Sequence, residues 1–227
     1  MAIKSRAEKK FRSVVRLIAE NLRNGIIAGK LTPGERFSEE KLAASLKVSA
    51  VPLRDALRRL EAEGYITFKS HGEVEISKPT LEEIEDYYAI AGVLEGLAAR
   101  LAVERATADE IARLKELHQA LKKAYQEKNL VRYFDANTNF HGYIGGMARN
   151  ERLRRLTTQV RQEIQKTRIL TLHVPHRADY SMREHDQILD AFLKRNPELA
   201  ECVVVAHMNN QMKTIKKMLQ AEDRTKP

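Results

Sequence analysis

One stretch, residues 38–72, constrains the fold more than any other part of the chain; it reads SEEKLAASLKVSAVPLRDALRRLEAEGYITFKSHG. Ser38 is a good N-cap, because its hydroxyl can accept a hydrogen bond from a free backbone N–H in the first helical turn. The apolar residues that follow it share one face of a short helix. Lys47-Val48 forms a turn, Ser49 caps a second helix, and Pro52 lies in its first turn, where a missing N–H costs little. These signals predict two short helices joined tightly.

The second helix has two chemically distinct faces. Its apolar face would bury against the first helix and carries Leu53, Ala56, Leu57 and Leu60. Its opposite face carries three cations: Arg54, Arg58 and Arg59. Gly64 ends the helix, and the alternating residues 66–69 and 73–77, joined by Ser70–Gly72, predict a two-stranded wing. An ordinary helical hairpin with a solvated charged face is the alternative. The order of cap, turn, cap, arginine face and hairpin favours a winged helix-turn-helix that enters a DNA groove.

The charge of the chain fits a polyanionic partner. The 227 residues carry a net charge of +9, with a sequence pI near 9.6. Residues 1–79 carry a net charge of +6, although they are a shorter segment than residues 80–227. Cys202 is the single cysteine, which excludes an internal disulfide and suits a reducing cytosol. No apolar run is long enough to span a bilayer, and Met1–Lys10 is too charged for a signal peptide, so we expect a cytoplasmic protein.

Helical periods dominate the rest of the chain. A first helix is expected over residues 11–28, before the winged unit. Lys78-Pro79-Thr80 reads as a linker, and Thr80 begins a capping box that starts the next helix. About six helices follow. We therefore predict a mainly α protein with a winged helix-turn-helix domain at 1–79 and an all-helical bundle at 80–227.

The N-terminal motifs resemble the GntR family of bacterial transcription regulators. The matching residues are Gly29-Lys30-Leu31-Thr32-Pro33-Gly34-Glu35-Arg36, Ser38-Glu39, Leu42-Ala43, Val48-Ser49, 52–60 (PLRDALRRL) and Glu63-Gly64. The helical part resembles the FadR-type effector domain, called FCD, through residues 94–102 (LEGLAARLA), Phe140-His141, Glu184-His185 and His207. Two departures stand out. Ala50-Val51 replaces the Arg-Thr pair usual in the family, which predicts an operator that departs from the family norm. Asn137 replaces an aspartate, with Asp135 two residues earlier.

The resemblance and the residue types together predict how DNA is bound. A guanidinium can grip guanine or a phosphate through two hydrogen bonds, which favours the arginines of the second helix for groove contacts. Lys47 and Ser49 would touch the backbone, and His71-Gly72 at the wing tip suits a minor groove. The expected DNA-binding residues are Lys47, Ser49, Arg54, Arg58, Arg59, His71 and Gly72. Readers of this type bind two-fold operators as dimers, so we expect a homodimer on double-stranded DNA, with the helical domain as its platform.

Three histidines lie on the apolar faces of three predicted helices: His141, His185 and His207. A single histidine in such a place is usually a hydrogen-bonded core residue. The resemblance implies that these three converge on one divalent ion, and imidazoles suit zinc or nickel. Asn137 shares the face of His141 and could offer a carbonyl oxygen. His173 and His176 are a second pair, expected to be solvated loop residues.

The helix around His141 is rich in glycine: Gly142, Gly145 and Gly146. Either a cavity beside the metal or close helix packing would explain them. The resemblance implies a small carboxylate effector, often bound with an arginine at the position of Ala91 here. Arg161 or Arg168 could supply that cation instead.

A ligand-responsive transcription regulator is the function predicted, with repression the expected mode. A metal-dependent enzyme with a DNA-binding arm is the alternative; the sequence shows no HExxH, no nucleophile–base pair and no carboxylate placed as a general base near the histidines. A constitutive architectural DNA-binding protein is a third interpretation. We therefore expect no enzymatic activity.

Overall fold

The computed structural model describes residues 2–172, 174 and 176–224, with the backbone alone for 2–7, 71, 172 and 222–224. The chain divides into two compact units, with the boundary between Lys78 and Pro79. Each unit has its own core.

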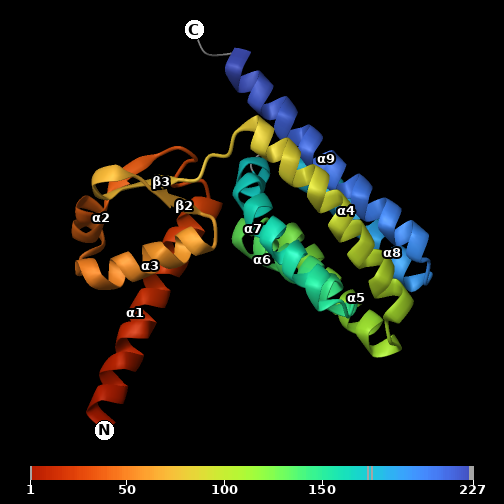
Figure 1. The fold of residues 1–227 in the computed structure, drawn as a ribbon, viewed down its shortest axis with the longest axis horizontal. Helices are drawn as coiled ribbons and strands as arrows, with labels where there is room; N and C mark the ends of the chain where they lie inside the picture. The colour runs from red at the N-terminus through yellow and green to blue at the C-terminus, as the bar shows by residue number, and fades with distance from the viewer. Residues whose placement is uncertain (1, 173, 175, 225–227) are drawn as a thin grey trace. The chain divides into compact units, whose positions relative to one another are not determined.

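The first unit is a winged helix-turn-helix (Figure 1). Its elements are α1 (Ala2–Ile27), β1 (Arg36–Ser38), α2 (Glu39–Leu46), α3 (Ala50–Ala62), β2 (Ile66–Phe68), a 3₁₀ turn (Ser70–Gly72) and β3 (Glu73–Ile76). The strands form an antiparallel sheet in the order β1-β3-β2. The wing thus has a third strand, β1, which the sequence did not predict. Three residues are too few to show an alternating pattern, and the partner of Phe37, Val74, is far away in sequence.

The caps of the helix-turn-helix are partly as predicted. The Ser38 hydroxyl accepts a hydrogen bond from the Lys41 backbone N–H, at 3.2 Å. Lys47 adopts the left-handed conformation at the turn, with φ 54°. Ser49 occupies the N-cap position of α3, but its side chain makes no capping hydrogen bond. The expected apolar faces differ in burial, since α3 buries its leucines whereas α2 has no fully buried residue.

The second unit consists of six helices within the described residues, which confirms the predicted all-helical architecture. They are α4 (Leu81–Arg105), α5 (Ala108–Gln126), α6 (Leu130–Met147), α7 (Glu151–Leu172), α8 (Arg177–Leu193) and α9 (Pro197–Arg224). The predicted capping box at Thr80–Glu83 starts α4, and a second capping box at Thr107–Glu110 starts α5. The sequence Ser181-Met182-Arg183-Glu184 is a capping pattern that predicts a helix start at Ser181, but the structure begins α8 earlier, at Arg177. No helix in the described part is long and apolar enough to cross a membrane.

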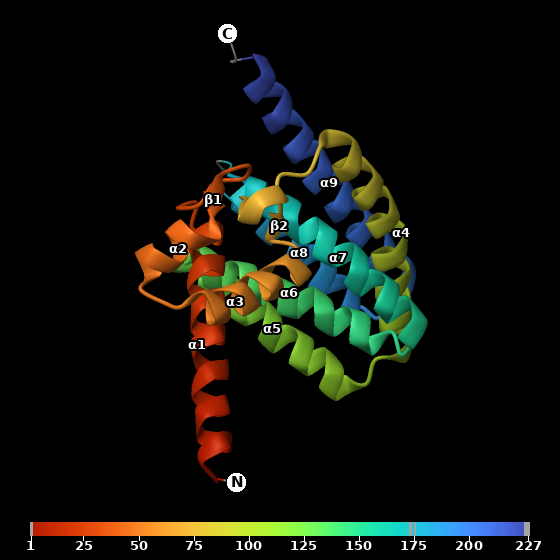
Figure 2. The ribbon, with the colours of Figure 1, turned by 60° about the vertical axis from the view of Figure 1, so that its left-hand side comes forward.

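The long helices α4 and α9 lie side by side in both views (Figures 1 and 2). Their close approach depends on Gly96, because a Cβ built there would lie 2.7 Å from Cγ2 of Val205. Large side chains of α6 and α8, Phe140 and Phe192, are fully buried in the main core. This core holds α6, α8 and α9 together, and these are the helices that carry the three histidines.

Candidate metal centre and DNA-binding surface

The structure brings the three predicted histidines together. His141 on α6, His185 on α8 and His207 on α9 are at most 4% exposed. Each offers one ring nitrogen, and these atoms all lie within 4.8 Å of one another. Asn137, one turn before His141, lies beside them, with its Nδ2 2.9 Å from Nε2 of His185. Asp135 is not part of the cluster of ligand atoms.

The outer nitrogens of the histidines face hydrogen-bond acceptors. Nδ1 of His185 lies 2.6 Å from the Ser181 carbonyl oxygen, and Nδ1 of His207 lies 2.6 Å from a carboxylate oxygen of Glu184. Nδ1 of His141 lies 3.5 Å from a carboxylate oxygen of Glu95. A backbone carbonyl can only accept, so the proton of His185 belongs on Nδ1. Partners of this kind fix the tautomer of metal-binding histidines and leave Nε2 as the ligand.

The inner nitrogens fit a cation. Nε2 of His141 and Nε2 of His185 are 3.1 Å apart. With both protons on Nδ1, two lone pairs would face each other at that distance, which repels unless a proton or a cation lies between them. Two histidine ligands of one tetrahedral zinc ion at ordinary Zn–N lengths lie about 3.3–3.4 Å apart, close to the distance between these two nitrogens. The residues present therefore fit a divalent ion bound by nitrogen.

Two side-chain amides flank the inner nitrogens. The Asn137 amide can donate to Nε2 of His185, and the Gln211 amide can donate to Nε2 of His207 at 3.1 Å. Because the oxygen and nitrogen of an amide are nearly the same size, a rotation would exchange the donor for an acceptor. Gln211 is one turn after His207, and the sequence analysis did not assign it to the site.

Burial keeps the triad neutral. It lowers the pKa of His141 and of His185 well below the ordinary value, and nearby positive charge adds to the effect. Burial also lowers the pKa of His207, although the Glu184 carboxylate opposes it. Neutral imidazoles retain the lone pairs that a metal requires.

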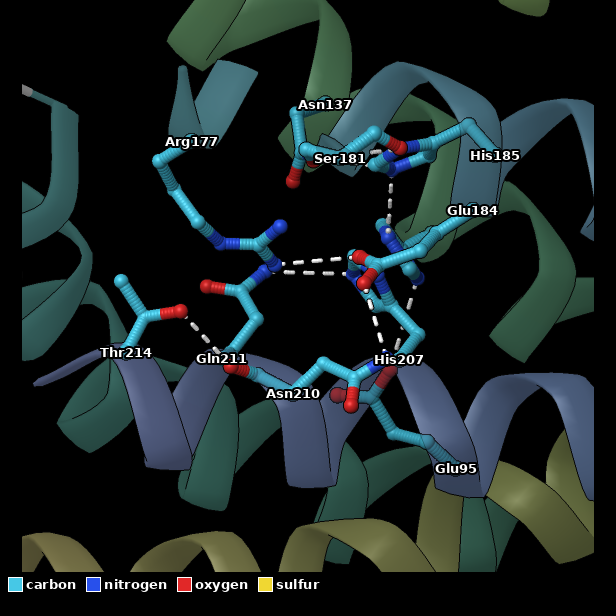
Figure 3. A network of polar contacts seen from close by, with 11 residues as sticks. Glu95, Asn137, Arg177, Ser181, Glu184, His185, His207, Asn210, Gln211 and Thr214 are labelled. Atoms are coloured by element: carbon cyan, nitrogen blue, oxygen red, sulfur yellow. Dashed lines mark hydrogen bonds and ion pairs between the residues drawn. The ribbon is translucent and has the colours of Figure 1, made fainter. Parts of the chain in front are cut away.

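Glu184 is the centre of a polar network around His207 (Figure 3). One of its oxygens accepts from His207 and from Arg177 Nη2, at 2.6 and 3.0 Å. The other accepts from Asn210 Nδ2 at 3.0 Å. Burial acts to raise the pKa of Glu184, but the hydrogen bond to His207 and the charge of Arg177 outweigh it, so the net shift is downward. Glu184 thus stays ionised and joins the triad to Arg177.

Glu95 is the second carboxylate beside the triad. It is 6% exposed, it pairs with Arg161 Nη2, and its Oε1 has no hydrogen-bond partner among the described residues. The sequence showed no carboxylate placed as a general base near the histidines; the structure brings Glu95 and Glu184 beside them, each paired with an arginine. Glu95 on α4 contacts His141 on α6, and Glu184 on α8 contacts His207 on α9. A helical period in the sequence cannot reveal such contacts between helices. Glu184 precedes His185 in sequence, which was the one available signal.

Two cavities border the triad. One is lined by polar groups that include Asn137, Arg168, Arg177, Ser181 and Gln211. Both arginines are less than a tenth exposed. Arg168 donates to Thr138 and stacks over the Phe134 ring, 4.4 Å from its centre. Tyr133 also lines this cavity, and its buried hydroxyl has no hydrogen-bond partner among the described residues. Cations and donors around one small space suit an anion such as a carboxylate.

The other cavity explains two of the glycines. Gly142 and Gly145 line it, together with His141, Glu95 and Arg161. A Cβ built at Gly142 would meet no atom within 4 Å, and one at Gly145 would only reach Thr157 at 3.9 Å. These positions are therefore not points of close helix packing, and the cavity explanation is favoured. Of the two arginines predicted for an effector, Arg161 lies at this cavity and Arg168 at the other.

The predicted DNA-binding residues lie on the exposed side of the helix-turn-helix. Lys47, Ser49, Arg54, Arg58, Arg59 and Gly72 are all exposed. Arg54 pairs with Glu39 and Arg59 with Glu63, each at 2.9 Å. Arg58 has no acidic partner among the described residues. Gly72 has φ +73°, a conformation that favours glycine at the wing tip. The side chain of His71 lies outside the described part, as does the whole of His173, and His176 is exposed beside Asp179.

Comparison with known proteins identifies the family. Residues 15–76 match the bacterial regulatory proteins of the gntR family, and residues 86–210 match the FCD domain. This chain belongs to the GntR family. It is 31% identical over 203 residues to the HTH-type transcriptional regulator YdhC of Bacillus subtilis, covering 88% of this chain and 89% of that one. It is 30% identical over 183 residues to the Nta operon transcriptional regulator of Aminobacter aminovorans, covering 81% and 85%.

Solved structures support the same fold for this GntR-family regulator. A GntR-type regulator from Rhodococcus sp. RHA1 aligns with a TM-score of 0.73 at 24% identity, over 90% of this chain and 98% of that one. Escherichia coli McbR/YncC aligns with a TM-score of 0.72 at 20% identity, over 91% and 98%. The family and the curated relatives are transcription regulators and not enzymes, which confirms the predicted class of function.

Proposed function

We propose that this GntR-family regulator is a metal-containing sensor, whose affinity for its operator changes when a small carboxylate binds in the helical domain. The observation that carries the proposal is the shared geometry of the triad and the cavity. Three neutral histidines gather ring nitrogens within 4.8 Å of one another, and Asn137 both contacts one of these nitrogens and lines the cavity with Arg168 and Arg177. A divalent zinc or nickel ion bound there would supply positive charge next to the two arginines.

The contacts of Arg177 suggest how the two sites are coupled. Its guanidinium donates to Glu184, which also accepts from His207. A carboxylate that binds Arg177 would compete with Glu184 and so disturb the partner that orients His207. A coupling of this kind is reciprocal, so the metal also changes the affinity for the acid. Because α8 and α9 carry these residues, the packing of these two helices would change between the states.

A homodimer is part of the proposal. Apolar side chains at Ile90, Val93 and Leu97 are 50%, 68% and 38% exposed, and their spacing places them along one side of α4. A second copy of the chain would cover them. Two copies would also supply the two recognition helices that a two-fold operator requires. We propose repression as the mode and the cytoplasm as the location, where the operator is.

The direct test starts from protein purified without chelator. Metal analysis, with zinc and nickel titrations of the dialysed protein, should find about one ion per chain. An operator is then selected from random duplexes, and a panel of mono-, di- and tricarboxylates is screened for release of the DNA at a buffered metal concentration.

Release by one class of acid, lost after metal removal and restored by metal, supports the sensor. Metal binding without any response to acids would make the ion structural. Operator binding that is insensitive to both would identify a constitutive DNA-binding protein.

A further inference from the structure

The N-terminal half of α1 lies outside the part of the chain that matches the gntR family. The match begins at residue 15, whereas α1 begins at Ala2. This half continues past α3 with its end free (Figures 1 and 2). A helical extension that packs so little of itself against the winged unit contributes little to that core.

Cations dominate this extension. Over residues 2–16 the sequence has six, against Glu8 as the one acidic residue: Lys4, Arg6, Lys9, Lys10, Arg12 and Arg16. From residue 8 onward the side chains are described, and all four of these later cations are exposed. Arg16 lies 3.7 Å from Glu20, a pair more than half exposed. Lys9, Lys10 and Arg12 have no acidic partner among the described residues. Exposed pairs are weak and screened by salt, so even Arg16 stays available to a polyanion.

Three of the cations share one cleft with the recognition helix. Lys9, Arg12 and Arg16 line an open cleft between α1 and α3, and Asp55 and Arg59 line it from α3. Their spacing of three and four residues places them along one side of α1. Asp55 is the one acidic residue in this lining, against four cations.

The cleft lies next to the face of α3 that is expected to read bases. Asp55 comes directly after Arg54, and Arg59 directly after Arg58. One residue along an α-helix corresponds to a rotation of about 100° around the helix axis. The basic side of α1 therefore borders the predicted major-groove contact, and Arg59 belongs both to the cleft and to that contact. With α3 in the groove, the basic side of α1 would therefore face the DNA backbone that flanks the groove.

We propose that Lys9, Arg12 and Arg16 form a second DNA-binding surface, which binds backbone phosphates beside the bases read by α3. This inference rests on the DNA-binding function of the family. It assigns to the extension a contribution to affinity that is independent of base sequence, since phosphate contacts carry no direct sequence information. Arginine and lysine both suit this role, because a phosphate can be bound as a point charge.

The test measures how operator affinity depends on salt. Each phosphate neutralised contributes about 0.9 to the slope of log K against log salt concentration. The triple variant Lys9→Ala, Arg12→Ala, Arg16→Ala should reduce the size of the slope by roughly two to three for each bound chain, about five for a dimer, and lower affinity at least roughly ten- to hundredfold at 0.15 M salt. Its preference among operator sequences should stay the same.

Two matched controls separate the alternatives. Lys115→Ala, Lys122→Ala, Lys123→Ala removes the same charge from exposed positions of α5 and should leave the slope unchanged. The charge-preserving variant Lys9→Arg, Arg12→Lys, Arg16→Lys should keep the wild-type slope, which excludes a loss of helix as the cause. Thermal unfolding of all variants checks that the fold is intact.

The duplex length locates the contact. Shortening the selected operator at both flanks should reduce the effect of the triple alanine variant, because the phosphates are then absent. An unchanged slope in that variant, or an equal loss in the α5 control, would overturn the inference. If the triple alanine variant loses as much affinity on the shortest duplex as on the longest, the contact lies within the bases read by α3. That result would also overturn the inference. If the wild-type protein selects no duplex at all, the failure is that of the DNA-binding function itself.

Discussion

Arginine is used in two opposite environments in the two units of this regulator. On α3, Arg54 is 57% exposed and Arg58 has no acidic partner among the described residues. In the helical domain, Arg168 and Arg177 are 8% and 7% exposed, and both are held by neighbouring groups. Exposed arginines on a helix can adapt to a long polyanion that desolvates them on binding. Buried, restrained arginines have already lost their side-chain freedom, so a small anion can bind without that cost.

Histidine is distributed unevenly between the two units. Six of the seven histidines belong to the second unit, and the side chain of His71, in the first unit, lies outside the described part. Among the histidines whose side chains are described, four are buried: His118, His141, His185 and His207. In the proposed function, sensing would depend on groups fixed inside the helical bundle, and DNA binding on groups at the surface. This division can be broken experimentally from either side.

The largest expected effect is on the metal centre. His185→Ala removes the proposed ligand whose Nε2 contacts both His141 and Asn137. We expect zinc or nickel affinity to fall by at least about a hundredfold, because two nitrogen ligands remain and the Ser181 carbonyl loses its donor. Isothermal titration of metal into dialysed protein measures the change. His176→Ala, at an exposed histidine, is the matched control and should bind metal like the wild type.

The second expected effect is on the DNA side. Arg58→Ala should weaken operator binding roughly ten- to hundredfold if the guanidinium binds a base edge, and should relax the preference at one base pair. Arg59→Ala should cost less, because Arg59 is already paired with Glu63. Fluorescence anisotropy on the selected operator and on its single-base variants measures both. Equal affinities for wild type and Arg58→Ala would remove this residue from the interface, and metal affinity should not change in either variant.

The third expected effect is a pH dependence of stability that differs between the two units. Burial lowers the pKa values of His118, His141, His185 and His207, so below pH 6.5 the unfolded chain binds protons that the folded domain does not. The free energy of unfolding of the metal-free helical domain therefore falls as pH decreases from about 7 to 5, by up to about 1.4 kcal/mol per pH unit for each histidine. Hydrogen exchange resolved by segment, corrected for intrinsic rates, should show less protection in α5–α9 and little change in α1–α3. A uniform change across both units would contradict the comparison.

The sequence predicted the helices well where local signals determine them. Thr80 and Thr107 open helices with capping boxes, and the arginine face of α3 is exposed as its period predicts. The convergence of the histidines came from the family resemblance, because periodicity places each on a buried face without showing which buried faces meet. Arg177 was missed for a similar reason, since the start of α8 was expected after it.

Strand β1 and the partners of the triad show the same limit. β1 is stabilised by pairing with β3, and Glu95 and Glu184 reach histidines on neighbouring helices. Contacts between distant segments carry no local pattern. Gly96 is a further example, because its role depends on Val205 in another helix.

The smallest expected effect, and the sharpest for the metal centre, comes from Asn137→Asp. In the metal-free protein the Asn137 amide can donate to Nε2 of His185, and an aspartate could not. A carboxylate would face that lone pair inside the core, so the melting temperature of the metal-free variant should fall below that of the wild type. With metal, an anionic oxygen replaces a neutral one, and metal affinity should rise by about tenfold. The two effects have opposite signs, so a general loss of stability cannot imitate them.

Asn137→Leu is the matched control for this prediction, because it removes the amide without adding charge. It should lower metal affinity instead of raising it. Differential scanning calorimetry with and without zinc, on all three proteins, gives both quantities in one experiment. A carboxylate at position 137 that lowers metal affinity would show that the ion is not bound next to this residue. The triad would then be a hydrogen-bonded core, and the buried arginines of the adjacent cavity would have to sense an acid without the help of a metal.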